Sequence, residues 1–285
     1  MPLPTVRSFD IKTTRRRPSA APFGGKQLQL KHVELEIGDE HVAVVRLNRP
    51  PVNALEQEIR EEIVWVFDTL HDRDEVRAVV LTGRGKVFCA GADIKAKVSM
   101  SDEPGTYVRA NRLIREAFYC IMECPKPVIA AVNGAAIGAG FAMATCCDIL
   151  VAAEDAVFAM PEIDVGLAGG VGFMQRVLPP AKLRRLLLTG ERVPATELYR
   201  LGVVEKCVPA ADLMTVALDL ARQIASKSPL ASRMIKESFG MVENLPLRDA
   251  YRLEQNVTIA LSKTSDAREA QRAFVEKRKP RFTGR

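Results

Sequence analysis

Two short runs of small residues could each present backbone N–H groups to a developing negative charge. They are 88–95 (FCAGADIK) and 133–140 (NGAAIGAG), and each follows an apolar run and precedes a predicted helix. Small side chains let a ligand approach the main chain, and the first turn of a helix has unpaired N–H donors. Two such donors on one oxygen are each worth about 3 to 4 kcal/mol to an anionic transition state. The alternative is a plain strand-to-helix connection with Asp93 as a first-turn carboxylate.

A third run, 160–172 (MPEIDVGLAGGVG), supplies candidate acids. A carboxyl group buried among apolar residues has a raised pKa, which suits an acid or base that works near neutral pH. Glu162 is therefore the candidate general acid/base. We expect Asp164 to be an exposed loop residue, and Asp148, between a helix and a strand, to be structural.

Other chemistries are disfavoured. The second run has glycines at 134, 138 and 140, so it lacks both the GxGxxG spacing and the Lys-Ser/Thr of a phosphate loop. All three histidines precede the glycine-rich runs, which argues against a histidine triad or a zinc site. The six cysteines form no CxxC pair, and most are expected to be reduced, buried and inert, Cys146 and Cys147 included. No metal site is predicted.

Alternating strands and helices must position these runs, which indicates an α/β fold. Helical or strand periodicity is expected in the following ranges: strands 41–47, 76–81, 128–132 and 148–153, a short strand into residue 88, and helices 53–70, 107–122 and from about 138. After residue 208 the pattern predicts helices at 211–225, 229–242, 247–261 and 266–277. We therefore expect a mobile arm at 1–30, a core at 31–208 and a helical subdomain at 209–285.

Composition is that of a soluble globular protein: 285 residues, 47% hydrophobic and 27% charged, with a net charge of +6 concentrated near the two ends. The longest apolar stretch, 128–149, is broken by Asn133, glycines and Asp148, so no membrane span is expected. No signal-peptide pattern is evident, which favours a cytoplasmic location.

Five motifs in order resemble the enoyl-CoA hydratase/isomerase, or crotonase, family. They are the strand 42–47 with Asn48-Arg49-Pro50, then AGADIK at 90–95, PVIAAVNG at 127–134, Pro161-Glu162, and AFVEKRKP at 273–280. The resemblance runs from about residue 33 to the end. It implies a spiral of ββα turns, followed by helices that build a homotrimer or a dimer of trimers. It also implies an acyl-CoA thioester substrate and no separate cofactor, because coenzyme A is part of that substrate.

The same resemblance assigns the site. The N–H groups of Ala92 and Ala139 would form an oxyanion hole, with Glu162 as general acid/base. Coenzyme A and the acyl group would lie along the residues of the two turns and of one further turn: Val52, Ala54, Ala90, Gly91, Asp93, Ile94, Lys95, Gly138 and Gly140. Phe274 and Lys277 would reach the nucleotide end, often from a neighbouring subunit.

One departure bears on the reaction. Hydratases of the family use two glutamates, and Ala142 stands where the first is expected. Adding water is easiest with two carboxylates, whereas one is enough to move a proton between carbons and shift a double bond. Isomerisation is slightly favoured, and hydration with a substitute second acid stays open. Residues 162–168 also look like the dienoyl-CoA isomerase branch, which has an aspartate where this chain has Gly170.

Two further readings are weaker. A dehalogenase would need an aspartate nucleophile and a histidine near the first turn, and 87–96 contains no histidine. A family homologue binds AU-rich RNA through lysines, so a CoA- or RNA-binding protein without catalysis is conceivable. Few aromatic residues accompany the basic runs 15–17 and 277–285, which makes nucleic-acid binding a remote alternative.

Overall fold

The structure is a computed structural model that describes residues 29–93 and 103–285. It divides into two compact units, Leu30–Ser226 and a unit that contains Lys227–Arg285. Most of the arm expected at 1–30 and the predicted contacts at Ile94 and Lys95 lie outside the described residues. Within the described residues, no helix is long and apolar enough to cross a membrane.

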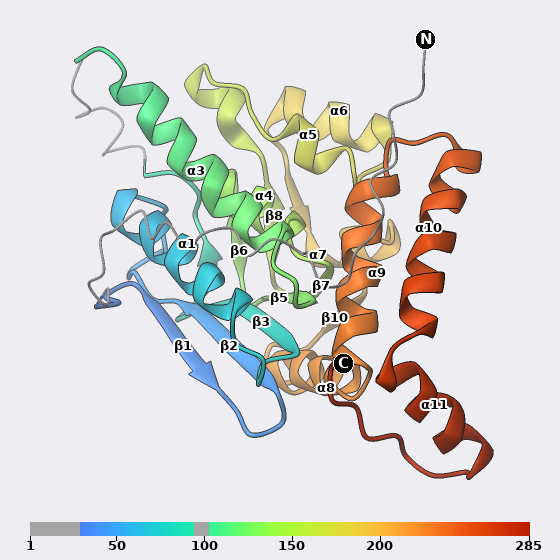
Figure 1. The fold of residues 1–285 in the computed structure, drawn as a ribbon. Coiled ribbons are helices and arrows are strands. Elements are labelled where there is room, and N and C mark those ends of the chain that lie inside the picture. The colour runs from blue at the N-terminus through green and yellow to red at the C-terminus, as the bar shows by residue number, and fades with distance from the viewer. Residues whose placement is uncertain (1–28, 94–102) are drawn as a thin grey trace. The chain divides into compact units, whose positions relative to one another are not determined.

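A six-stranded sheet forms the centre of the first unit (Figure 1). Its strands, in spatial order, are β1 (Val33–Ile37), β2 (Val42–Leu47), β3 (Ala78–Gly83), β5 (Val128–Val132), β7 (Ile149–Ala153) and β10 (Lys206–Val208). β1 pairs antiparallel with β2, and every later pairing is parallel. β3 and β5 are almost wholly apolar and buried, as expected of parallel strands covered on both faces.

A smaller sheet runs alongside, with β4 (Val87–Cys89), β6 (Ala135–Ile137), β8 (Val157–Ala159) and β9 (Arg192–Pro194) in that order. The chain passes from the large sheet to the small one three times, from β3 to β4, from β5 to β6 and from β7 to β8. Each passage is one turn of a ββα spiral. The predicted spiral architecture is therefore confirmed.

Helices cover these sheets. The first unit contains α1 (Gln57–His71), α3 (Thr106–Met122), α4 (Ala139–Thr145), the 3-10 turn η2 (Pro161–Val165), α5 (Val171–Met174), α6 (Pro180–Thr189), α7 (Ala195–Arg200) and α8 (Leu213–Ala225). α1 presents Ile59, Ile63 and Val66 at helical spacing, and all three are fully buried. α1 lies beside α3, while α8 packs on β2, β3, β5 and β7. Because α8 covers the sheet, the second unit begins at Lys227 rather than at residue 209.

The second unit is helical, with α9 (Pro229–Val242), α10 (Leu247–Ser262) and α11 (Ser265–Val275). Ser228 caps α9 by accepting from the N–H of Ala231, and Thr264 caps α11 by accepting from the N–H of Ala267. The buried carboxylate of Asp266 accepts from the N–H of Thr283 at 2.8 Å, which fastens the end of the chain to α11.

Candidate active site

A cavity of about 690 Å³ opens in the first unit between α1, α3, α4 and the turn η2. Four of the residues predicted from sequence line it together: Ala92, Asp93, Ala139 and Glu162. One wall is apolar, with side chains from α3 and α5 that include Phe118 and Phe173, whose rings meet edge to face at 5.2 Å. The cavity thus combines two backbone turns, one carboxylate and an apolar wall.

The N–H of Ala92 is directed away from the neighbouring segment at Leu55. Leu55 donates its N–H to the oxygen of Gly91 at 2.7 Å, and Asp93 donates to the oxygen of Leu55 at 3.4 Å, which is a one-residue parallel bridge. In such a bridge the residue between the two bonds turns its own N–H to the opposite side. No hydrogen bond between described residues uses the Ala92 N–H, so it is available to a ligand.

The second donor comes from the start of α4. Ala139 is the first residue of this helix, so its N–H has no intrahelical acceptor. The two turns touch: a Cβ built on Gly91 would lie 3.3 Å from the nitrogen of Ala139 and 2.5 Å from the oxygen of Ile137. Only glycine fits there, since its φ is also +88°. The two turns therefore lie in contact beside the cavity.

Glu162 lies against the second turn. It is half-buried in η2, and its Oε2 is shielded from solvent. A Cβ built on Gly138 would come within 2.5 Å of the Glu162 Oε1, so the carboxylate abuts the residue that precedes Ala139. The N–H of Leu167 donates to the Glu162 carbonyl at 2.8 Å and closes the turn behind the side chain.

No acid lines the cavity at residue 142 or residue 170, the two positions at which the sequence departs from the expected second carboxylates. Ala142 lies in α4, only 2% exposed, and presents a methyl group to the cavity. Gly170 also lines the cavity, and a Cβ built on it would meet the Met160 Cε at 2.4 Å. Asp148 has a structural contact, as expected, because it accepts from the N–H of Val128 at 2.7 Å. Asp164 is exposed, as expected of a loop acid.

An ionic frame supports the first turn. The Nε of Arg49 lies 2.5 Å from Glu56 Oε1, and its Nη2 lies 3.2 Å from Asp93 Oδ2. Burial opposes the charge on Arg49, but these two carboxylates together raise its pKa. Asp93 therefore serves the frame as well as lining the cavity.

Asn53 connects the turn after β2 to β4 through side-chain hydrogen bonds, a role that was not predicted from its residue type. It is 1% exposed with a φ of +52°, and its Nδ2 donates to the oxygen of Val87 at 2.8 Å. The predicted coenzyme A residues Val52 and Ala90 lie in this turn, joined by a hydrogen bond from the Ala90 N–H to the Val52 oxygen at 3.0 Å. Val52 and Ala90 are not among the cavity-lining residues, and neither are Ala54, Gly91, Gly138 and Gly140. An asparagine inside an otherwise apolar turn was the available signal.

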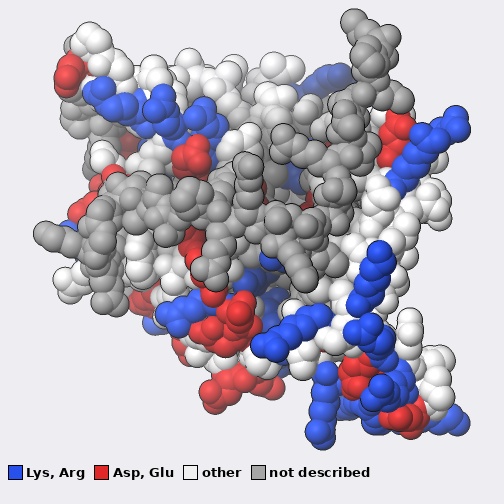
Figure 2. Space-filling view, viewed as in Figure 1, with Lys and Arg blue, Asp and Glu red and all other residues white. Residues whose placement is uncertain are grey.

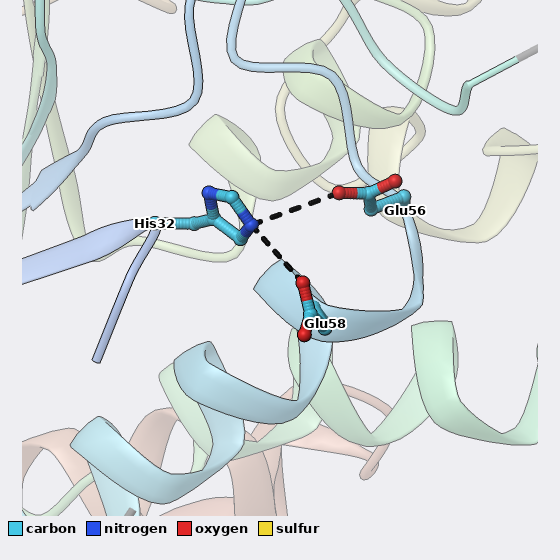
Figure 3. Close-up of side chains that lie close together, drawn as sticks. All are labelled: His32, Glu56 and Glu58. Atoms are coloured by element: carbon cyan, nitrogen blue, oxygen red, sulfur yellow. Dashed lines mark hydrogen bonds and ion pairs between the residues drawn. The ribbon is translucent and has the colours of Figure 1, made fainter. Parts of the chain in front are cut away.

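His32, Glu56 and Glu58 form a cluster at the edge of α1, drawn in Figure 3. The His32 Nε2 lies 3.2 Å from Glu58 Oε2 and 3.8 Å from Glu56 Oε1. Glu56 already pairs with Arg49, and Glu58 pairs with the Nζ of Lys31 at 2.8 Å. These ion pairs account for the cluster without a metal ion.

The six cysteines are free thiols. Burial raises the pKa of Cys89 and of Cys146 to about 12, and it raises that of Cys207 as well. Cys146 and Cys147 are buried in the core and are not among the cavity-lining residues. They are therefore inert packing residues, as the sequence predicted.

Phe274 and Lys277 belong to the second unit, where Phe274 is 87% exposed. Their contact with coenzyme A stays a prediction.

Known proteins resemble the chain along most of its length. The profile of the family Enoyl-CoA hydratase/isomerase matches residues 38–285. A carnitinyl-CoA dehydratase of Escherichia coli strain K12 is 35% identical over 254 residues, which cover 85% of this chain and 94% of that protein. The crystal structure of an enoyl-CoA hydratase from Bacillus anthracis superposes with a TM-score of 0.86 at 32% identity, covering 90% of this chain and all (100%) of the other. An enoyl-CoA hydratase structure from Polaromonas sp. JS666 gives 0.83 at 34% identity, with 88% and 99% covered. The chain belongs to the enoyl-CoA hydratase/isomerase family.

Proposed function

We propose that this enzyme shifts the double bond of an unsaturated acyl-CoA thioester, with Glu162 as its proton carrier. The thioester oxygen is held by the N–H groups of Ala92 and Ala139. The observation that carries the proposal is the pairing of one carboxylate, Glu162, packed against the turn that bears the Ala139 N–H, with a methyl group at Ala142.

The proposed reaction balances without a cofactor. The Glu162 carboxylate takes a proton from C2 of a 3-enoyl-CoA, the charge moves onto the thioester oxygen, and the same proton or one exchanged on Glu162 returns to C4. The double bond moves from C3–C4 to C2–C3, and coenzyme A leaves with the product. Each N–H donor to the oxyanion is worth roughly 10²- to 10³-fold in rate, and the general base roughly 10²- to 10⁴-fold.

Hydration of a 2-enoyl-CoA is the second candidate. Both similar crystal structures are described as hydratases. Of the other carboxylates that line the cavity, Glu56 and Asp93 pair with Arg49, whereas Glu61 is half-buried and accepts from the Nε2 of Gln57 at 2.8 Å. Glu61 is therefore the substitute second acid that hydration would use.

One experiment separates the two reactions. The protein is incubated with crotonyl-CoA, 3-hexenoyl-CoA and a dienoyl-CoA, and the products are analysed by mass. Isomerisation leaves the mass of 3-hexenoyl-CoA unchanged while conjugating its double bond. Hydration adds the mass of one water to crotonyl-CoA. Loss of neither activity in Glu162→Gln would contradict both candidates.

We also propose that the chain assembles as a homotrimer or a dimer of trimers through its helical unit. Large apolar side chains are exposed on α9, α10 and α11, which supports self-association: Phe239 67%, Leu247 85%, Tyr251 58%, Ile259 55%, Phe274 87% and Val275 80%. Light scattering would measure the mass of the assembly, and a monomer at micromolar concentration would contradict the proposal.

Nucleic-acid binding gains little support from the charged surface. Lys and Arg side chains gather around the end of α11, with acidic side chains among them (Figure 2). Arg278 there pairs with Glu269 at 2.6 Å and with Glu276 at 2.5 Å. A paired guanidinium releases fewer counterions on binding phosphate, so this tail offers a weak electrostatic site.

A further inference from the structure

A buried arginine, Arg60, lines the cavity, whereas the Arg49 of the frame does not. Arg60 lies in α1 directly after the buried Ile59, and it is only 9% exposed. Its Nη2 donates to the carbonyl oxygen of Leu55 at 2.6 Å. That carbonyl also accepts from the N–H of Asp93, in the bridge that orients the Ala92 N–H. The guanidinium is therefore held beside the strand that carries one of the two oxyanion donors.

The guanidinium of Arg60 has few hydrogen-bond acceptors among the described residues. Its Nε is buried, and no described residue accepts a hydrogen bond from it. No described carboxylate forms an ion pair with its guanidinium, and Nη1 donates to none of the described residues. Burial lowers the pKa of Arg60, although the more distant charges of Asp93 and Glu56 act in the other direction. Because a guanidinium remains protonated in proteins, a positive charge stays at the cavity.

The contrast with Arg49 indicates what this charge can bind. Arg49 takes up both nearby carboxylates, Glu56 and Asp93, in direct ion pairs. Arg60 keeps only a carbonyl, and burying an incompletely hydrogen-bonded charge costs free energy. A carboxylate inside the cavity would offset that cost, because its two oxygens match the fork of a guanidinium.

We propose that Arg60 is a specificity-determining residue that selects acyl chains ending in a carboxylate, so that the preferred substrates are CoA thioesters of unsaturated dicarboxylic acids. The inference rests on the proposed function for the acyl-CoA site and deepens it. The apolar wall at Leu113, Phe118 and Phe173 takes the carbons between the thioester and the terminal carboxylate.

Binding is measured first, since it does not depend on turnover. Isothermal titration compares adipoyl-CoA with hexanoyl-CoA, two saturated thioesters of equal length that differ in a terminal carboxylate and methyl group. A hydrogen-bonded charge pair predicts that wild-type protein binds adipoyl-CoA roughly ten- to hundredfold more tightly. Arg60→Met should abolish this preference and change hexanoyl-CoA affinity less than about threefold. Equal affinities in the wild type, or an unchanged preference in Arg60→Met, would overturn the inference.

Arg109→Met is the matched control. Arg109 also lines the cavity, but it is exposed on α3 and donates to the Thr106 Oγ1 at 3.0 Å. The Arg109→Met control should keep the preference for adipoyl-CoA. An equal loss of this preference in both variants would mean that any positive charge near the cavity produces it, and would overturn the inference. If thermal melting shows that Arg60→Met folds poorly, the inference is tested by the affinities of the wild type and of Arg60→Lys for the two thioesters. Arg60→Lys is expected to retain part of the preference for adipoyl-CoA.

Turnover then separates this inference from the proposed function. Wild type is assayed with 3-hexenoyl-CoA and with the monothioester of 3-hexenedioic acid. A kcat/KM at least about tenfold higher for the dicarboxylic substrate, lost in Arg60→Met, supports the inference. Equal turnover of the two substrates overturns the role of Arg60 but leaves the isomerase proposal standing. A carboxylate preference in binding with no turnover of either substrate supports Arg60 and contradicts the isomerase.

Discussion

The η2 turn and the helix α4 face the same cavity with opposite chemistry. η2 brings a half-buried carboxylate, Glu162, while α4 brings an N–H donor at Ala139 and a methyl group at Ala142. The donors depend on backbone geometry that Gly91 makes possible, whereas the acids depend on single side chains. In the proposed mechanism the backbone donors therefore bind the thioester, and the number of carboxylates in the cavity decides between isomerisation and hydration.

The largest effect is expected at Glu162. Glu162→Gln removes the only base of the proposed isomerisation, so kcat on 3-hexenoyl-CoA should fall roughly 10²- to 10⁴-fold. Steady-state kinetics with absorbance of the conjugated product measure it. Asp164→Asn is the control, because this acid of the same turn is exposed and is not among the cavity-lining residues. A similar loss in the two variants would contradict a specific role for Glu162.

The next effect concerns the contact between Gly138, which precedes α4, and the Glu162 carboxylate of η2. Gly138→Ala places a methyl group 2.5 Å from the Glu162 Oε1 at a φ of +54°, so it should displace both the carboxylate and the Ala139 N–H. We expect kcat to fall roughly 10²- to 10³-fold. Gly166→Ala is the matched control, because its φ is +69° but nothing lies within 4 Å of the added carbon. If the control lost as much activity, backbone strain rather than the contact would explain the result.

A smaller change should follow from restoring the missing acid. Ala142→Glu puts a second carboxylate on the α4 wall, and we expect the ratio of hydrated to isomerised product to rise about tenfold. Burying the larger side chain should lower stability by about 1 to 3 kcal/mol, seen in urea unfolding. Ala142→Gln controls for size. An equal product ratio for the Glu and Gln variants would show that the second carboxylate does not decide the reaction.

The smallest effect on catalysis is expected for an acid of the second unit. Hydrogen bonds from Arg278 and from the N–H of Arg281 lower the pKa of Glu269 to about 2. Its ionised form therefore stabilises the folded state fully above the ordinary value near 4.5, and this stabilisation is lost as the pH falls from there toward 2. Glu269→Gln should flatten the melting temperature across this range and leave kcat at pH 7 unchanged. A steep acid dependence in Glu269→Gln would contradict the assignment.

The spacing of apolar residues predicted most of the strands and helices, because it shows which side chains are buried. The strand β5 occupies the predicted residues 128–132, since five consecutive apolar residues fit only a buried strand here. The helix expected from residue 53 begins at Gln57, because Asn53 and Leu55 are held by β4 and by the Ala92 bridge. Strands β6, β8 and β9 were not predicted, as three residues are too short to display a period.

The candidate site was predicted only in part, for a related reason. Residue types suggested backbone donors in the two turns and an acid at Glu162, and the family resemblance assigned the donors to Ala92 and Ala139. Arg60 lies next to the apolar stripe of α1, and helical spacing does not tell which neighbours of that stripe open onto a cavity. The boundary between the two units was predicted at residue 209, before α8. Helical spacing does not tell which element an apolar face packs on, and α8 packs on the sheet of the first unit.

Isotope labelling tests most directly whether Glu162 moves a proton between carbons without adding water. Wild-type protein is incubated with 3-hexenoyl-CoA in water labelled with oxygen-18, and the product is followed by mass and by absorbance. Single-carboxylate isomerisation predicts that conjugated 2-hexenoyl-CoA accumulates without the label and that Glu162→Gln stops its formation. Unchanged 3-hexenoyl-CoA, together with conversion of 2-hexenoyl-CoA to a labelled hydroxyacyl-CoA, would contradict the account.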